Sequence, residues 1–158
     1  MAHRCFLSDD LPPALDNVVR AFAHEAARLR SQEVRQVPQV LEIVEPHLRS
    51  QGWDLAQGAR QKHGLSIAAV AGPPIKADGV NRQERAALWV ETGRSWTNNG
   101  YLEHLVRPSA CPTVDHVAIA LREIYTGPAY EKSVNAIDQL LSSGRLGLPY
   151  RSVVIIGF

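Results

Sequence analysis

The chain has 158 residues, of which 45% are hydrophobic and 21% are charged, and its formal net charge is +1. This length and composition are typical of a globular protein with a substantial core, so we expect residues 1–158 to form a single domain. A net charge near zero gives no global signal for nucleic-acid binding. Any contact with DNA must therefore depend on a local basic surface.

Several classes of protein are disfavoured by the sequence. No apolar run approaches the roughly 18 residues that a membrane span requires, and residues 1–5 lack the apolar core of a signal peptide. Cys5 and Cys111 are far apart and fit free thiols in a reducing compartment. The six histidines are scattered, without the spacing of a zinc site. We expect a cytoplasmic protein that does not bind membranes.

Two helices are predicted in the first third of the chain. One covers residues 14–32, where apolar side chains recur at spacings of three and four. The other covers residues 39–50 and ends at Gly52. It contains Pro46, which predicts either a kink or an early break. The apolar side chains of the first helix are Leu15, Val18, Val19, Phe22 and Ala26.

Three strands with short connections are predicted next, at residues 65–71, 75–80 and 86–92. Short links between consecutive strands favour an antiparallel meander. The third strand is largely apolar, which is typical of a strand in the middle of a sheet. Residues 53–56 before them read either as a further strand or as a loop that packs Trp53.

The rest of the chain alternates helices and strands. Helices are predicted at residues 100–107 and 129–143, and buried strands at 114–124 and 151–157. The last two strands are joined by a helix, so we expect them to be parallel neighbours with a right-handed crossover. The predicted fold is α/β, with a mixed central sheet (a three-strand meander plus two further strands joined by a helix) flanked by helices.

Two carboxylates stand out on the predicted meander. Asp78 lies on its second strand, and Glu91 lies near the end of its third strand, on the same face as Trp89. If the two strands pair, the carboxylates converge and repel each other unless a cation lies between them. Oxygen ligands of this kind suit Mg²⁺ or Mn²⁺. The simpler interpretations are a turn at Asp78-Gly79 and a surface or ion-paired Glu91.

The order of elements, with Asp78 on one strand and Glu91 near the end of the next, resembles the PD-(D/E)XK nuclease superfamily, which includes many type II restriction endonucleases. The resemblance implies a restriction-endonuclease-like fold in which Asp78 and Glu91 bind the metal ion. It also implies a lysine two residues after the glutamate, but Gly93 occupies that position. In an alternative register Glu91 is the third motif residue, and Trp89 then stands at the first glutamate position.

The resemblance also assigns supporting roles. Lys76 or Arg94 would replace the missing lysine and stabilise the phosphate. An accessory metal ligand on the early helix would be Glu42 or Glu45, and we take Glu45 as the metal ligand. The loop after Glu91 carries side chains that suit nucleic-acid binding, although an N-capping loop with a packed tryptophan is the simpler explanation. These loop residues are Arg94, Trp96, Asn98 and Asn99.

The sequence thus predicts a Mg²⁺- or Mn²⁺-dependent nuclease that hydrolyses DNA phosphodiester bonds. A small chain that cuts both strands usually needs two sites, so we expect a homodimer. The absence of a side chain at Gly93 and the near-neutral charge favour an alternative, a catalytically inactive relative that binds DNA or protein. A third interpretation is an assembly subunit of a nucleic-acid-processing complex.

Overall fold

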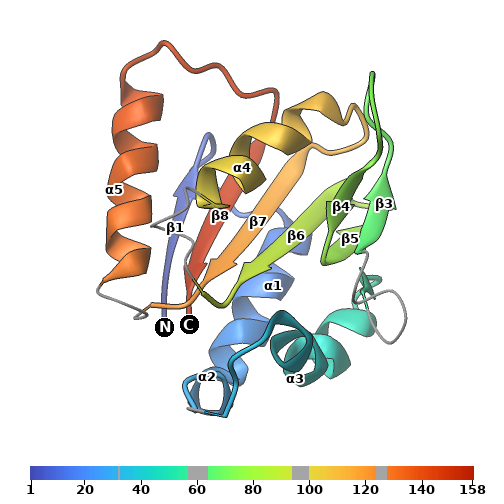
Figure 1. The fold of residues 1–158 in the computed structure, drawn as a ribbon, viewed down its shortest axis with the longest axis vertical. Coiled ribbons are helices and arrows are strands. Elements are labelled where there is room, and N and C mark those ends of the chain that lie inside the picture. Colours follow the sequence, from blue (N-terminus) through green and yellow to red (C-terminus); the bar gives the residue numbers. More distant parts are fainter. Residues whose placement is uncertain (32, 57–63, 94–99, 124–127) are drawn as a thin grey trace.

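The computed structural model describes residues 1–31, 33–56, 64–93, 100–123 and 128–158. A six-stranded mixed sheet in the order β1-β8-β7-β6-β5-β2 lies at its centre, with helices on both faces (Figure 1). This confirms the predicted α/β class. A separate two-stranded sheet pairs β3 with β4. The strands are β1 (Ala2–Phe6), β2 (Asp54–Leu55), β3 (Leu65–Ile67), β4 (Ile75–Ala77), β5 (Gly79–Asn81), β6 (Ala86–Glu91), β7 (His116–Leu121) and β8 (Ser152–Gly157).

The helices cover the sheet from opposite sides. α1 contacts β7 and β8 and α3 contacts β6 on one face, whereas α4 contacts β6 and β7 and α5 contacts β8 on the other (Figure 1). No helix among the described residues is long and apolar enough to cross a membrane. The helices are α1 (Pro13–His24), α2 (Ala26–Leu29), α3 (Val37–Arg49), α4 (Gly100–Val106) and α5 (Ala129–Ser142).

The middle of the sheet is parallel and buried on both faces. β6 pairs with β7 in parallel, and β7 pairs with β8 in parallel, which confirms the predicted arrangement of the last two strands. All six residues of β8 are buried, as are five of the six in β6 and in β7. Helices on both faces remove these strands from water, which explains their nearly continuous apolar sequences. β6, which ends in Glu91, is therefore a central strand as predicted.

The predicted meander is wrong in its first strand, the one expected at residues 65–71. β5 pairs antiparallel with β6, but the next strand of this sheet is β2, not the segment after Leu65. β3 instead pairs with β4 outside the main sheet, and it ends at Ile67. The single strand predicted over residues 75–80 is divided at Asp78 into β4 and β5. Asp78 therefore lies at the junction of the two strands.

Two further elements differ from expectation at the N-terminal end. β1 was not predicted: it is an edge strand paired antiparallel with β8, and its first three side chains are exposed, so it lacks an alternating apolar pattern. The helix predicted over residues 14–32 is divided at Glu25 into α1 and α2. By contrast, α3 continues through Pro46, so the early break considered there does not occur.

Candidate functional site

Asp78 lies inside the main sheet, at the interruption between β4 and β5. Its backbone N–H donates to the carbonyl of Leu88 (2.9 Å), and its own carbonyl accepts from the N–H of Ala56 (2.8 Å). Its side chain is held as well, because Oδ2 accepts a 2.8 Å hydrogen bond from the N–H of Val90. Asp78 is therefore a bend bonded to the backbone on both sides of it, and β5 begins at the following Gly79. The carboxylate is fixed at the edge of β6.

Gly79, the first residue of β5, lies very close to side chains of both neighbouring strands, β2 and β6. A Cβ atom on Gly79 would lie 2.8 Å from Cδ2 of Leu55 and 3.3 Å from Cβ of Leu88. A side chain at this position would require Leu55 to shift, so glycine allows β5 to pass close between β2 and β6. The adjacent Asp78 is thereby held against β6, so the Asp-Gly sequence has a packing role.

Glu91 forms the second part of the site together with a histidine from the following helix. Nε2 of His104 on α4 donates a 2.6 Å hydrogen bond to Oε1 of Glu91. The His104 ring also stacks on Trp89, with ring centroids 6.0 Å apart and an interplanar angle of 19°. Trp89 is fixed in turn, because its Nε1 donates to the carbonyl of Lys76 (2.7 Å). The side chains of β6 thus orient the imidazole over the strand.

The pKa of Asp78 depends on its burial and on the charges of Glu91 and His104. Burial raises the pKa of Asp78 to about 6, and the negative charge of Glu91 acts in the same direction. The hydrogen bond from Val90 and the positive charge available on His104 oppose this rise in pKa. Asp78 is therefore a carboxyl group that changes protonation state close to neutral pH. Such groups are concentrated at functional sites.

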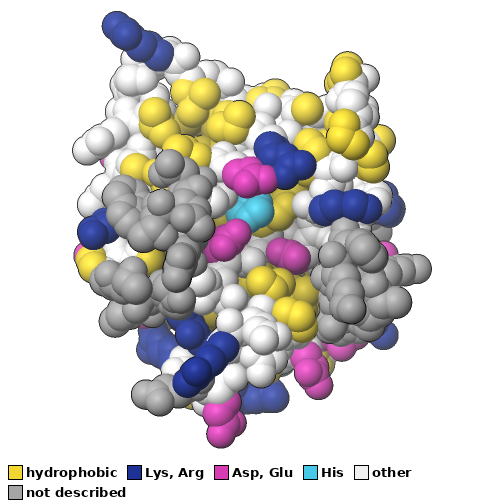
Figure 2. Space-filling view, in the orientation of Figure 1, with side chains coloured by type: hydrophobic (Ala, Val, Ile, Leu, Met, Phe, Trp, Pro, Cys, Tyr) yellow, Lys and Arg dark blue, Asp and Glu magenta, His cyan; other side chains and the backbone are white. Residues whose placement is uncertain are grey.

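The carboxylates of Asp78 and Glu91 are each held through one oxygen atom. Oδ2 of Asp78 and Oε1 of Glu91 are engaged by Val90 and His104, but within the described ranges Oδ1 and Oε2 accept no hydrogen bond. Carboxylate oxygens are the ligands that Mg²⁺ and Mn²⁺ prefer. Figure 2 shows acidic side chains beside a histidine near the centre of the face that α4 covers. We call Asp78, Glu91 and His104 the acidic site.

Other residues assigned to the site make different contacts or lie outside the described residues. Nζ of Lys76 donates to Oγ of Ser66 (2.6 Å), its cross-strand neighbour in the β3–β4 sheet. Glu45 forms an ion pair with Arg49 one turn later on α3. The catalytic role of Lys76 and the metal-binding role of Glu45 stay predictions. The predicted loop residues Arg94, Trp96, Asn98 and Asn99 lie outside the described residues.

His104 was not identified from the sequence, although a weak signal was present. A helix that joins two parallel strands packs over the strand before it, so the inward positions of the helix after β6 face that strand. Tyr101 and Leu105 occupy these positions and are buried. His104 comes three residues after Tyr101, a spacing that places both on one side of the helix. Pairing it with Glu91 needed knowledge of how far α4 reaches along β6.

Comparison with protein-family models, curated proteins and solved structures finds no match for this chain. Its function must therefore be inferred from its own side chains. The strongest observation is that Glu91 is hydrogen-bonded to His104 of α4, while Asp78 is bonded to the neighbouring Val90 and its pKa is affected by the charges of both.

Proposed function

We propose that this protein is a metal-dependent nuclease that hydrolyses DNA phosphodiester bonds at the acidic site. The observation that carries the proposal is the pairing of β5 with β6, which brings the carboxylate of Asp78 to the strand that ends in Glu91. Two acids that share one ion would be relieved of their mutual repulsion, and carboxylate oxygens are the ligands that Mg²⁺ and Mn²⁺ prefer.

The order of elements around the two acids supports the proposal. An antiparallel hairpin, β5–β6, is followed by α4 and then by β7, which is parallel to β6. This order agrees with the resemblance to PD-(D/E)XK nucleases drawn from Asp78 and Glu91. Under the proposal, Asp78 is the first metal-binding acid of the family pattern and Glu91 is the second.

Each residue of the acidic site then has a defined task. Asp78 and Glu91 would bind the ion through Oδ1 and Oε2, and the bound ion would activate water and offset the charge of the phosphodiester transition state. His104 donates from Nε2 to Glu91, which leaves Nδ1 to accept or release a proton. We propose that His104 supplies the proton-transfer group that the family pattern places at Gly93.

A second function is favoured by one specific observation. Gly93 has no side chain, and none of the described residues comes within 4 Å of a Cβ atom built there. A protein that keeps the fold but has lost cleavage would bind DNA or another protein instead. Calorimetric titration with Mn²⁺ separates the two, because a binding module without the metal site would release no heat of metal binding.

Plasmid cleavage tests the nuclease directly. We expect the wild type to nick or linearise supercoiled DNA with Mg²⁺ or Mn²⁺ and to be inactive in EDTA. Asp78→Ala and Glu91→Ala should abolish cleavage, whereas Asp9→Ala, which alters an exposed carboxylate, should retain it. Equal activity in all four proteins would refute the assignment.

The expected partners follow from the proposed reaction. One acidic site per chain cuts one strand, so a double-strand break requires two copies, and we propose a homodimer. Analytical ultracentrifugation with and without DNA tests this, and a monomer that still linearises plasmid in one binding event would contradict it.

A further inference from the structure

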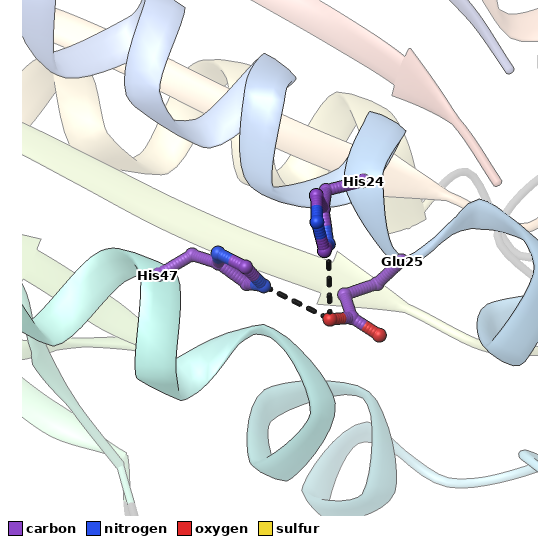
Figure 3. Close-up of side chains that lie close together, drawn as sticks. All are labelled: His24, Glu25 and His47. Carbon is purple, nitrogen blue, oxygen red and sulfur yellow. Dashed lines mark hydrogen bonds and ion pairs between the residues drawn. The ribbon is translucent and has the colours of Figure 1, made fainter.

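Three metal-binding side chains meet where α1 and α2 pack against α3, separately from the acidic site. Nδ1 of His24 lies 3.3 Å and Nε2 of His47 lies 2.9 Å from the same carboxylate oxygen, Oε1 of Glu25. The three ligand atoms all lie within 4.8 Å of one another. Figure 3 shows both imidazoles directed toward that oxygen, one from α1 and the other from α3.

The break between α1 and α2 produces this convergence. Neighbouring residues of a regular helix point about 100° apart around its axis, so His24 and Glu25 would not normally face the same space. Here α1 ends at His24, and Glu25 leaves the regular helical conformation with φ −94° and ψ 10° before α2 begins. The change of direction brings Glu25 toward α3, where His47 completes the group.

The Glu25 carboxylate is far more buried than the two histidines. The Glu25 side chain is only 10% exposed, compared with 70% for His24 and 35% for His47. Arg28 donates from Nη1 to Oε2 of Glu25 at 2.9 Å, so Oε1 is the oxygen left facing both rings. A buried, oriented carboxylate beside two accessible imidazoles is a preorganised set of ligands.

We propose that His24, Glu25 and His47 form a binding site for one divalent transition-metal ion of the Zn²⁺ class. Two histidines and a glutamate are one of the ligand sets that zinc uses when it keeps a fourth position open. With bonds of about 2.0–2.2 Å and tetrahedral angles, the ligand atoms should lie about 3.3–3.5 Å apart. The observed 3.3 Å fits, and the 2.9 Å contact needs only a small outward turn of His47.

The nitrogen donors make this site chemically different from the acidic site. Imidazole favours Zn²⁺, Ni²⁺ and Co²⁺, whereas carboxylate oxygens favour Mg²⁺ and Mn²⁺. Both histidines also line an open surface pocket that extends to Asn17 and Gln51, so an ion and a fourth ligand can reach them from solvent. Bound at this position, the ion would link the α1–α2 junction to α3.

Titration of the full chain with Co²⁺ and Zn²⁺ tests the site. We expect one equivalent of Co²⁺ to give the intense visible absorption of a four-coordinate ion, and Zn²⁺ to displace it. His24→Ala and His47→Gln should weaken Zn²⁺ binding by more than the roughly 10–100-fold that loss of an outer-shell partner causes. The double variant Asp78→Ala/Glu91→Ala and the exposed control His3→Ala should bind one equivalent as the wild type does.

Far-ultraviolet circular dichroism of each variant excludes loss of folding as the cause. His24 is largely exposed, so His24→Ala removes a ligand without opening the core. The proposal is overturned if the wild type binds no Co²⁺ or Zn²⁺, or if His24→Ala and His47→Gln bind them unchanged. It is equally overturned if only the Asp78/Glu91 variant loses binding. The three side chains would then be a hydrogen-bonded cluster only.

Discussion

Asp78→Asn replaces a carboxylate inside the sheet with a neutral amide of nearly the same shape. The amide oxygen can still accept the hydrogen bond that the Val90 N–H donates to Asp78. The substitution therefore removes the charge and little else. We expect it to abolish metal-dependent cleavage and, in metal-free buffer at neutral pH, to make the protein more stable. A gain in stability with a loss of activity is typical of a strained functional group.

The size of the effect follows from the pKa of Asp78, which burial raises from 3.8 to about 6. The folded state then holds this proton more tightly than the unfolded state. The wild-type free energy of unfolding therefore falls as pH rises through this window and levels off above it. The shift corresponds to at most about 3 kcal/mol, and partial contact with solvent reduces our expectation to about 1–2 kcal/mol.

Urea unfolding in EDTA measures this directly. We expect Asp78→Asn and wild type to differ little at about pH 4 and the variant to be about 1–2 kcal/mol more stable at about pH 7.5. Asp9→Asn removes an exposed carboxylate and serves as the control, with no comparable change between the two pH values. If Asp78→Asn were less stable at the higher pH, or if its advantage did not change with pH, burial of the Asp78 charge would not be destabilising.

Three further predictions concern the same region. Gly93→Lys should increase plasmid cleavage above that of Gly93→Ala, because no described residue lies within 4 Å of a Cβ atom at this position; equal rates would show that Gly93 does not stand at the lysine position. Gly79→Ala should destabilise the protein by about 1–3 kcal/mol, since its Cβ would overlap Leu55, whereas Gly93→Ala should leave the melting temperature unchanged. His104→Ala should slow cleavage by about 10²-fold, as expected for loss of a proton-transfer group, while calorimetry still detects Mn²⁺; an unchanged rate would exclude the role proposed for His104.

Local patterns in the sequence were sufficient for most of the secondary structure. The apolar runs that became β6, β7 and β8 predict buried strands because helices cover both faces of a parallel sheet. The sequences of α3 and α5 predict helices because one side of each helix packs against the sheet, which places apolar residues at helical spacing. The helical link between β7 and β8 was enough to predict their parallel pairing. Asp78 and Glu91 were singled out because they lie on consecutive predicted strands.

Partners distant in the chain were decided only by the tertiary structure. β1 forms because the edge of β8 is available, not because its exposed side chains favour a strand. β2 and not β3 completes the antiparallel part of the sheet, because the β3–β4 pair lies outside the ladder. Strand propensity is a weak guide to such pairing, which depends on the neighbouring strand.

The two side-chain clusters also depend on contacts between segments that are distant in the chain. His104 reaches Glu91 through the packing of α4 on β6. His47 reaches Glu25 across 22 residues of sequence, and only because the helix breaks between α1 and α2. In the sequence these histidines are scattered and without metal-site spacing. The sequence thus determined which segments are helices and central strands, because burial leaves a local periodic pattern. The tertiary structure decided which side chains meet, because that depends on contacts between distant elements.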